Sequence, residues 1–529
     1  MATLGETLVR LLEIYGTEIV FGIPGVHTAE LYRGLAGSPI RHVTPRHEQG
    51  AGFMADGYAR VTGKPGVAMV ISGPGLANIA TAMMQAKADS IPMLVIAGVN
   101  SPGKMDSGNG HLHEMPDQRG FADHVAAFAH TVLTPEELPQ VMARAFAVFE
   151  SARPGPVMIE IPVRLMRADA GHVALPDRKP EARPPAPDPQ RLAAVVEACR
   201  AATSPVILIG GGARRGAADA LALAESLDCP LIGTINARAC LPKDHPLAVP
   251  LNVGMEGVRD LLEESDLVLA FGTEFGPTDF DIDEAGPVGR PKKLVRVDID
   301  PEQLMRNFQP DIGLVGDAAM ALRQIRAALG PEGRKAGGAE RAAGAIRAAR
   351  ETLPEDYRAH IALLDAIRDR IPEAAFVGDS TQLVYAGNLG FGIGNRGHWF
   401  NSAVGFGTLG YALPAAIGAA LGRPGAPVVA IAGDGGLQFT LAELGTVADC
   451  GVPVIVVVWN NGGYLEIRYC MESRGIAPEG VSPSPPDFAK VAEAYGIGAT
   501  VLDGPEGVAD AVAEAVFRNA PFVIDVRGV

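Results

Sequence analysis

The chain has 529 residues, a net charge of −16 and a hydrophobic content of 47%, as expected for a globular protein with a large core and about three domains. The acidic balance argues against nucleic-acid binding, which needs a basic face, and no apolar run approaches the length of a membrane span. The N-terminus MATLGETLVRLLEIYG carries charges at a helical period, unlike a signal peptide, and the five cysteines are scattered. We therefore expect a cytoplasmic protein with no nucleic-acid or membrane partner.

Apolar runs of strand length alternate with helical patterns along the whole chain. Such continuous runs are typical of parallel strands that are buried on both faces. The first group is EIVFGIP, GVAMVIS, PMLVIAG and PVMIEIP, and a Pro-rich charged segment at residues 177–190 then predicts an extended linker. The second group is PVILIGG, DLVLAFG and KLVRVDID, followed by a Gly/Ala-rich charged segment at residues 330–345. The third group is AAFVGDS, PVVAIAG, PVIVVVW and PFVIDVR.

These groups predict an α/β fold of three domains, each a mostly parallel sheet flanked by helices. We expect the domains at residues 1–170, 188–330 and 350–529. The segment 330–345 is either a loop or an exposed helix, and the sequence leaves both open.

An acidic residue stands where the strand VVAIA should leave the core. Asp434 is surrounded by Gly433, Gly435 and Gly436. The helical pattern LQFTLAELGTVADCG and the strand VPVIVVVW then lead to Asn461, so this βαβ unit should place the two polar side chains side by side at the carboxyl ends of neighbouring strands. Carboxylate and amide oxygens suit Mg²⁺, and a glycine turn before a helix suits a phosphate. The unit therefore predicts a metal that carries a diphosphate, although either motif alone is equally typical of a turn.

The GDG turn and the NN pair, with 24 residues between them, resemble the motif of thiamin diphosphate (ThDP) enzymes. The segment 46–78, RHEQGAGFMADGYARVTGKPGVAMVISGPGLAN, strongly resembles acetolactate synthases and related 2-oxo acid decarboxylases, and the resemblance runs from Leu4 to about Val526. It implies pyrimidine-binding, middle and diphosphate-binding domains in that order. It also implies ThDP and Mg²⁺ as cofactors, a 2-oxo acid substrate, and active sites at the subunit interface of a homodimer or a dimer of dimers.

The resemblance also assigns roles to single residues. Glu48 takes the position of the glutamate that protonates the aminopyrimidine ring, Gly407 that of the carbonyl that accepts from the 4′-amino group, and Leu409 that of the bulky residue that keeps the cofactor bent. The other expected cofactor contacts are Pro24, Gly25, Gly73, Pro74, Asn78, Ser380, Thr381, Gln382, Gly433, Asp434, Gly435, Gly436, Asn461, Gly463, Tyr464 and Leu465. The expected metal ligands are Asp434, Asn461 and Gly463.

The middle block does not predict a flavin. Its VILIGGGARRGAADA run departs from G-x-G-x-x-G, because Arg215 stands at the third position after Gly210 and Gly212. FAD-dependent acetolactate synthases carry an arginine-rich segment where this chain has the acidic FGTEFGPTDFD, residues 271–281, so we expect no FAD.

Details of two loops suggest the subgroup. Pyruvate decarboxylases carry two adjacent histidines where GHLHE separates His111 from His113, and acetolactate synthases carry a Phe–Gln pair at Leu112 and His113. Together with NNGGYLEIRYCM, the pattern looks most like the 5-guanidino-2-oxopentanoate (2-ketoarginine) decarboxylase group. Glu466 lies at a position that lines the substrate pocket in related decarboxylases, and a carboxylate there suits a cationic tail. The candidate catalytic residues are Glu48, His113, Leu409 and Glu466.

Three functions stay open from sequence. The first is decarboxylation of a 2-oxo acid with a guanidino tail, the second is acetolactate synthase-like carboligation of pyruvate, and the third is a ThDP-binding regulatory or structural subunit. Intact Glu48, Asp434 and Asn461 favour an enzyme. Structural roles compete at two positions: His27 could cap its helix, and Glu466 could pair with Arg468 or Arg474.

Overall fold

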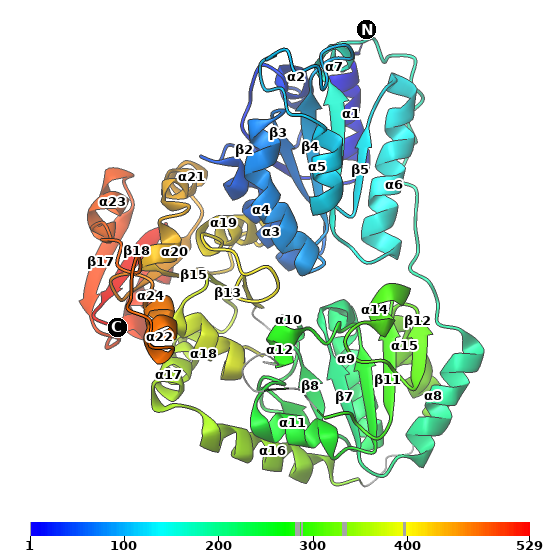
Figure 1. The fold of residues 1–529 in the computed structure, drawn as a ribbon, viewed down its shortest axis with the longest axis vertical. Helices are drawn as coiled ribbons and strands as arrows, with labels where there is room; N and C mark the ends of the chain where they lie inside the picture. The colour runs from blue at the N-terminus through cyan, green and yellow to red at the C-terminus, as the bar shows by residue number, and fades with distance from the viewer. Residues whose placement is uncertain (1, 281–285, 287–288, 331–335, 395–397) are drawn as a thin grey trace.

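The computed structural model describes residues 2–280, 286, 289–330, 336–394 and 398–529. These residues contain three six-stranded sheets, and every strand pair in them is parallel (Figure 1). The expected fold class is therefore confirmed. The predicted seam at 330–345 and the acidic segment 271–281 both extend into residues outside the described ones, at 331–335 and 281.

The first sheet has the strand order β2-β1-β3-β4-β6-β5. Its strands are β1 Ile19–Gly22, β2 Arg41–Val43, β3 Gly66–Val70, β4 Met93–Val99, β5 Phe128–Thr131 and β6 Pro156–Pro162. Its helices are α1 Leu4–Ile14, α2 Ala29–Leu35, α3 Glu48–Thr62, α4 Pro74–Ala88, α5 Gln118–Val125, the 3₁₀ turn η1 Pro135–Glu137, α6 Leu138–Ser151 and α7 Val163–Met166. The N-terminal helix begins after Thr3, which forms a capping box with Glu6.

The middle sheet has the order β12-β11-β10-β7-β8-β9, which is the order of doubly wound dinucleotide-binding folds. Its strands are β7 Pro205–Ile209, β8 Leu231–Gly233, β9 Ala248–Val249, β10 Leu267–Phe271, β11 Leu294–Asp298 and β12 Ile312–Val315. Its helical segments are α8 Pro189–Ala201, η2 Gly211–Gly216, α9 Ala217–Leu227, α10 Ile235–Arg238, α11 Glu256–Glu263, α12 Pro277–Phe280, α14 Pro301–Met305 and α15 Ala318–Leu329.

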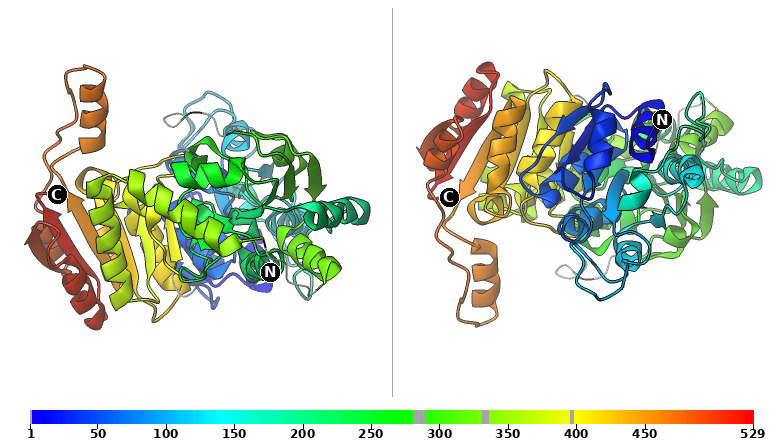
Figure 2. Two further views of the ribbon diagram at one scale, coloured as in Figure 1. Left: turned by 90° about the horizontal axis from the view of Figure 1, so that it is seen from below. Right: turned by 90° about the horizontal axis from the view of Figure 1, so that it is seen from above.

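The third sheet, β14-β13-β15-β16-β18-β17, repeats the strand order of the first. Its strands are β13 Ala375–Gly378, β14 His398–Asn401, β15 Val428–Gly433, β16 Val454–Asn460, β17 Gly498–Asp503 and β18 Phe522–Arg527. The helical segments from the seam onward are α16 Gly338–Thr352, α17 Glu355–Arg370, α18 Gln382–Gly390, α19 Ala412–Gly422, α20 Asp434–Leu437, η3 Leu441–Glu443, α21 Leu444–Cys450, α22 Leu465–Ser473, α23 Phe488–Ala494 and α24 Val508–Phe517. Figure 2 shows α22, in orange, standing away from the rest of its domain.

One helix expected from sequence is broken. The run LQFTLAELGTVADCG was predicted as a single helix between β15 and β16, but the chain forms α20, η3 and α21 there. Thr440 interrupts the run, since its hydroxyl donates to the carbonyl oxygen of Gly410 and its backbone leaves the helical region.

The first and third domains of one chain meet through α3 and α19. A Cβ atom at Gly57 would lie 2.0 Å from the carbonyl oxygen of Ala415, and one at Gly418 would lie 1.9 Å from that of Met54. Only glycine permits this approach, and one apolar core continues across both helices.

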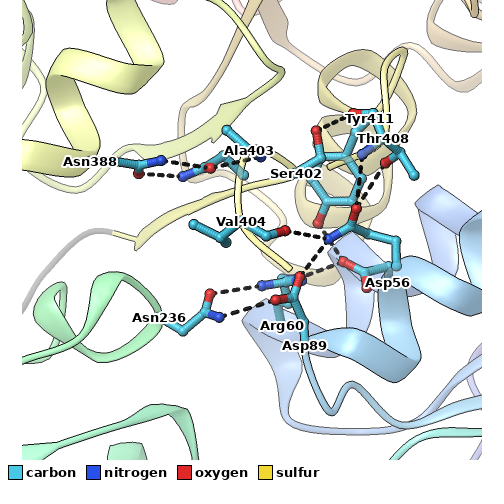
Figure 3. A network of polar contacts seen from close by, with 12 residues as sticks. Asp56, Arg60, Asp89, Asn236, Asn388, Ser402, Ala403, Val404, Thr408 and Tyr411 are labelled. Carbon is cyan, nitrogen blue, oxygen red and sulfur yellow. Dashed lines mark hydrogen bonds and ion pairs between the residues drawn. The ribbon is translucent and has the colours of Figure 1, made fainter. Parts of the chain in front are cut away.

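A buried charge network joins all three domains beside this contact (Figure 3). Arg60 donates to Asp56 at 2.6 Å and to Asp89 at 2.5 Å, and all three side chains are almost fully buried. Asn236 of the middle domain donates to Asp89 at 3.2 Å, and the Tyr411 hydroxyl of the third domain donates to Asp56. The network therefore fixes the three domains relative to one another.

Candidate active site

Asp434 and Asn461 lie side by side, as the βαβ unit predicts. β15 and β16 are paired in register up to Gly433 and Trp459, and the backbone N–H of Asn461 donates to Oδ1 of Asp434 at 3.3 Å. Burial raises the pKa of the Asp434 carboxyl, and backbone N–H donors such as that of Asn461 oppose the rise.

Two oxygens at this point fit a cation. Among the described residues, Oδ2 of Asp434 and Oδ1 of Asn461 are buried and have no hydrogen-bond partner. Buried polar oxygens are normally satisfied, so an oxygen-seeking cation such as Mg²⁺ would complete this arrangement. No three His, Cys, Asp or Glu side chains come together as a metal site in the described parts of the chain. Further ligands would come from groups outside this set, such as the backbone carbonyl of Gly463 and phosphate oxygens.

The loops around Asp434 and Asn461 pack closely against glycine residues and leave little room for a side chain there. A Cβ atom at Gly435 would lie 2.5 Å from the ring of Tyr464, and one at Gly433 would lie 3.2 Å from the Thr381 hydroxyl. Thr381 and Ser380 connect β13 to α18, which begins at Gln382. Gly436 lies within α20, so the segments proposed to contact a diphosphate converge at the carboxyl ends of β13, β15 and β16.

The loop between β14 and α19 carries Gly407 and Leu409. Gly407 is exposed and has a φ of +71°, a conformation that favours glycine. Leu409 is half-buried. The loop is anchored within its own domain by the backbone N–H of Gly410, which donates to Oδ2 of Asp379 at 2.8 Å.

A buried side chain of the first domain clamps the same loop. Nε2 of Gln85 donates to the carbonyl oxygen of Val404 at 3.2 Å, and its Oε1 accepts from the backbone N–H of Thr408 at 3.2 Å and from the Thr408 hydroxyl at 3.0 Å. Nε2 also donates to Asp89 at 2.8 Å, which links the clamp to the charge network.

Glu48 begins α3 and is buried, with 9% of its surface exposed. Its carboxylate accepts from Nδ2 of Asn78, on α4, at 2.9 Å. Pro24 and Gly25 follow β1, and Gly73 and Pro74 begin α4, so these residues gather at the carboxyl end of the first sheet.

A second glutamate, Glu443, orients the start of α3 from the third domain. It is 1% exposed, and its carboxylate accepts from the backbone N–H groups of Arg46 and His47, at distances of 3.0 to 3.1 Å. Burial raises the pKa of this carboxyl. No motif in the sequence pointed to Glu443 or Gln85.

His113 lies in the loop between β4 and α5, with a left-handed backbone at φ +57°. The histidine beside it is His27 and not His111, and the His27 and His113 ring centroids are 5.1 Å apart. His27 does not cap a helix, because Thr28 occupies the N-cap of α2 and Nδ1 of His27 bonds Oγ of Ser72.

Glu466 is half-buried on α22, immediately after Tyr464 and Leu465. Arg468 donates to the Ser482 hydroxyl at 2.7 Å, and no ion pair of Glu466 is present among the described residues. Its charge contributes, after burial, to the raised pKa values of Tyr357 and Tyr385, both about 12. Glu466 is therefore a carboxylate near two phenols, and it has no ion-pair partner in the described part of the chain.

The candidate residues form two groups within one chain. Glu48, Asn78 and His113 belong to the first domain, whereas Asp434 and Asn461 belong to the third. Among the described residues, no hydrogen bond or ion pair joins a candidate of one group to a candidate of the other.

A cavity of about 990 Å³ lies between the first and middle domains. The glycine run at 210–212 lines it together with Arg214 and Arg215. The expected absence of FAD stays a prediction. No helix within the described parts of the chain is long and apolar enough to cross a membrane.

Three family models match the chain: the N-terminal TPP binding domain of thiamine pyrophosphate enzymes at residues 2–121, their central domain at 192–325 and their C-terminal TPP binding domain at 379–526. The chain is 44% identical over 499 residues to the Pseudomonas aeruginosa protein named probable 2-ketoarginine decarboxylase AruI, covering 93% of this chain and 88% of that one. It is 32% identical to the acetolactate synthase isozyme 1 large subunit of Escherichia coli, over 99% and 93% of the two chains. It is 30% identical to a probable acetolactate synthase large subunit of Methanocaldococcus jannaschii, over 98% and 91%.

Proposed function

This chain belongs to the thiamine pyrophosphate (ThDP) enzyme family, and we propose that it is a ThDP- and Mg²⁺-dependent decarboxylase of a 2-oxo acid with a cationic guanidino tail. The observation that carries the substrate class is Glu466, a half-buried carboxylate without an ion pair among the described residues. The name of the Pseudomonas aeruginosa relative, probable 2-ketoarginine decarboxylase, supports the same substrate.

The residues of the third domain fit the diphosphate end of ThDP. Asp434, Asn461 and the Gly463 carbonyl would hold Mg²⁺, and the loops at Gly433–Gly436 and Ser380–Gln382 would hold the diphosphate. The assignment is supported by Oδ2 of Asp434 and Oδ1 of Asn461, which are buried and have no hydrogen-bond partner in the parts of the chain that the structure describes. When bound, ThDP supplies the electron sink that stabilises the carbon left behind when CO₂ departs.

The residues of the first domain fit the pyrimidine end. Glu48 would hold a proton at a ring nitrogen, with Asn78 fixing the carboxylate through their 2.9 Å hydrogen bond. The Gly407 carbonyl and the Leu409 side chain would support the bent cofactor from the third domain. Because no hydrogen bond or ion pair among the described residues joins these two groups, we propose that the first domain of one subunit completes the site of another, in a homodimer or a dimer of dimers.

The proposed substrate tail would meet Glu466. A guanidinium can form a bidentate pair with a carboxylate, and the neighbouring Tyr357 and Tyr385 rings would offer aromatic faces to the same cation. Acetolactate synthase-like carboligation of pyruvate is the second candidate, because several acetolactate synthases match nearly the whole chain at 30–33% identity. The intact Asp434 and Asn461, each with one buried side-chain oxygen that has no hydrogen-bond partner among the described residues, argue against a non-catalytic subunit.

The test is a CO₂-release screen with ThDP and Mg²⁺, in which 5-guanidino-2-oxopentanoate, pyruvate and an apolar 2-oxo acid are compared and acetolactate and acetoin are measured in parallel. Removing one partner of a buried charge pair costs roughly 2–5 kcal/mol, and a factor of ten corresponds to about 1.4 kcal/mol. Glu466→Ala should therefore lower kcat/KM for the guanidino substrate more than tenfold and spare the apolar acid, with Glu466→Gln in between.

Glu472→Gln is the matched control, because Glu472 is an exposed glutamate on the same helix. It should behave like wild type with every substrate. Wild-type rates for both Glu466 variants on the guanidino acid would remove Glu466 from substrate recognition. A wild-type enzyme that ignores this acid and makes acetolactate from pyruvate would establish the second candidate, and no turnover of any 2-oxo acid would favour a non-catalytic role.

A further inference from the structure

A buried glutamine of the first domain holds the backbone where α4 begins. Gln118 is the first residue of α5 and is 4% exposed. Its Oε1 accepts from the backbone N–H of Gly73 at 2.9 Å, and this hydrogen bond, the α4 anchor, spans 45 positions of the chain. Gly73 is the N-cap of α4 and has a left-handed φ of +64°. Gln118 therefore fixes a strained turn that is also an expected contact of the cofactor.

The Gln118 amide can make its hydrogen bonds in one orientation only. Its Nε2 donates to the carbonyl oxygen of Gly98, on β4, at 2.9 Å and to Oε2 of Glu160, on β6, at 2.8 Å. The Gly98 carbonyl only accepts and the Gly73 N–H only donates, so a flipped amide would place two donors together and two acceptors together. The backbone on both sides therefore sets the direction of the amide.

Glu160 completes the arrangement from β6. It is 2% exposed and is paired with Ala97 of β4 and Thr131 of β5. Its Oε1 accepts from the Thr131 hydroxyl at 2.6 Å, so each carboxyl oxygen has a donor. Burial raises the pKa of the Glu160 carboxyl, and the hydrogen bonds from Thr131 and Gln118 oppose the rise. Glu160 thus binds the second N–H of the Gln118 amide and limits its rotation.

The N-terminal end of α4 lies directly against Glu48. Nδ2 of Asn78 donates to Oε2 of Glu48 at 2.9 Å, and a Cβ atom at Gly75 would lie 3.5 Å from Oε1. Both residues belong to the helix that Gly73 caps, so a shift of its first turn would move the donor that fixes the Glu48 carboxylate. The hydrogen bonds of Gln118 therefore act on the position of Glu48 through one short stretch of helix.

We propose that Gln118 and Glu160 are positioning residues for the proton that Glu48 would hold at the cofactor ring. Gln118 fixes the start of α4, and Glu160 fixes the Gln118 amide by accepting a hydrogen bond. Neither side chain exchanges a proton in this role, so position 160 needs an acceptor but not a charge. The inference rests on the proposed function, in which Glu48 acts on ThDP.

Amide exchange tests the α4 anchor in the cofactor-free protein, independently of turnover. Gln118→Leu should speed hydrogen–deuterium exchange of residues 72–79 by about threefold to tenfold, because the loss of one buried hydrogen bond corresponds to roughly that factor. Gln140→Leu, at an exposed position on α6 of the same domain, is the matched control and should leave this exchange unchanged.

A conservative substitution separates the hydrogen bond of Glu160 from its charge. In Glu160→Gln, the new amide oxygen can accept from Gln118 while the new amide nitrogen donates to the Thr131 hydroxyl. This variant should exchange residues 72–79 at the wild-type rate. Glu160→Leu offers no acceptor and should resemble Gln118→Leu.

Turnover with ThDP and Mg²⁺ gives the second measurement. In Gln118→Leu and Glu160→Leu, kcat for the 2-oxo acid should fall about tenfold to a hundredfold, because a misplacement of about 1 Å can cost a hundredfold in rate. KM for the acid should stay within about threefold, since the proposed tail contact Glu466 lies in the third domain. Glu160→Gln should keep both constants within about threefold of wild type.

The double variant Gln118→Leu/Glu160→Leu covers the case in which a single substitution destabilises the domain, because it removes both buried partners together. Wild-type exchange and wild-type kcat in this variant would overturn the proposal. A Glu160→Gln variant as impaired as Glu160→Leu would overturn the role of Glu160 as an acceptor. A wild-type protein that releases no CO₂ from any 2-oxo acid would refute the proposed function instead, whereas the exchange experiment would still decide whether Gln118 holds α4.

Discussion

Substituting Gln85 tests whether the first domain holds the loop that carries Gly407. Gln85 lies on α4 of the first domain with none of its surface exposed, and three of its hydrogen bonds reach the loop of the third domain. Gln85→Leu keeps a similar volume but leaves the Val404 carbonyl, the Thr408 N–H and the Thr408 hydroxyl of the loop without these partners, and Asp89 also loses one donor.

The free-energy cost of the substitution follows from the number of hydrogen bonds that the loop loses. At about 0.5–1.5 kcal/mol for each neutral hydrogen bond, three bonds correspond to roughly 2–4 kcal/mol. Either the buried groups stay unsatisfied, or the loop moves until water satisfies them. In the second case cofactor binding has to restore the loop, and at about 1.4 kcal/mol per tenfold the dissociation constant of ThDP should rise at least tenfold.

Two assays check this expectation. Calorimetric titration of ThDP into the apo protein with excess Mg²⁺ gives the affinity, and hydrogen–deuterium exchange of residues 402–411 reports whether the loop has loosened. Gln140→Leu, at an exposed position on α6, is the matched control and should change neither quantity. Wild-type affinity and wild-type exchange in Gln85→Leu would refute the reasoning that the first domain holds this loop.

Four further predictions concern the cofactor, the assembly and the effect of pH. Glu48→Gln should abolish most CO₂ release while calorimetry still shows ThDP binding, whereas Asp434→Ala should lose Mg²⁺ and ThDP together; near wild-type turnover of Glu48→Gln would contradict its role. Sedimentation of the active protein should show a dimer or tetramer, and an active cofactor-loaded monomer would rule out a shared site. Purified protein should carry no stoichiometric flavin, which an absorption spectrum with about one flavin per chain would disprove. Burial raises the pKa of Asp379 from its ordinary value of 3.8 to about 6 in the folded protein. The fold therefore binds this proton more tightly than the unfolded chain does. The resulting stabilisation is complete below pH 3.8 and is lost as the pH rises through 6. The denaturant-derived free energy of unfolding should therefore fall by roughly 3 kcal/mol over this range relative to Asp379→Asn, and equal pH slopes would contradict this.

The central strands of all three sheets could be predicted from the sequence alone. β3, β4, β15 and β16 are buried on both faces, so their sequences are continuous apolar runs that need no partner to be recognised. The edge strands were missed: β2, for example, is Arg-His-Val, and β17 is nowhere fully buried. An edge strand buries little, so tertiary pairing determines it and its own residues carry a weak signal.

The Asp434–Asn461 pair was also predictable, because one βαβ unit brings both residues to the same sheet edge by local geometry. The spacing of a single unit is enough to place the two side chains, and family resemblance added Glu48, Gly407 and the other cofactor positions. As cofactor contacts, these positions are expectations from the resemblance, named before the fold was known.

Only the tertiary structure could decide the contacts between distant segments. His27, Ser72 and His113 follow β1, β3 and β4, and no spacing rule predicts that loops after these three strands meet. Gln85 is a polar residue on the buried face of α4, which suggests a buried hydrogen bond. The sequence does not identify its loop partners, which lie more than 300 positions away. A sequence pattern predicts the helix or strand that a residue belongs to. A hydrogen bond to another domain depends instead on how whole sheets pack together, which no local pattern predicts.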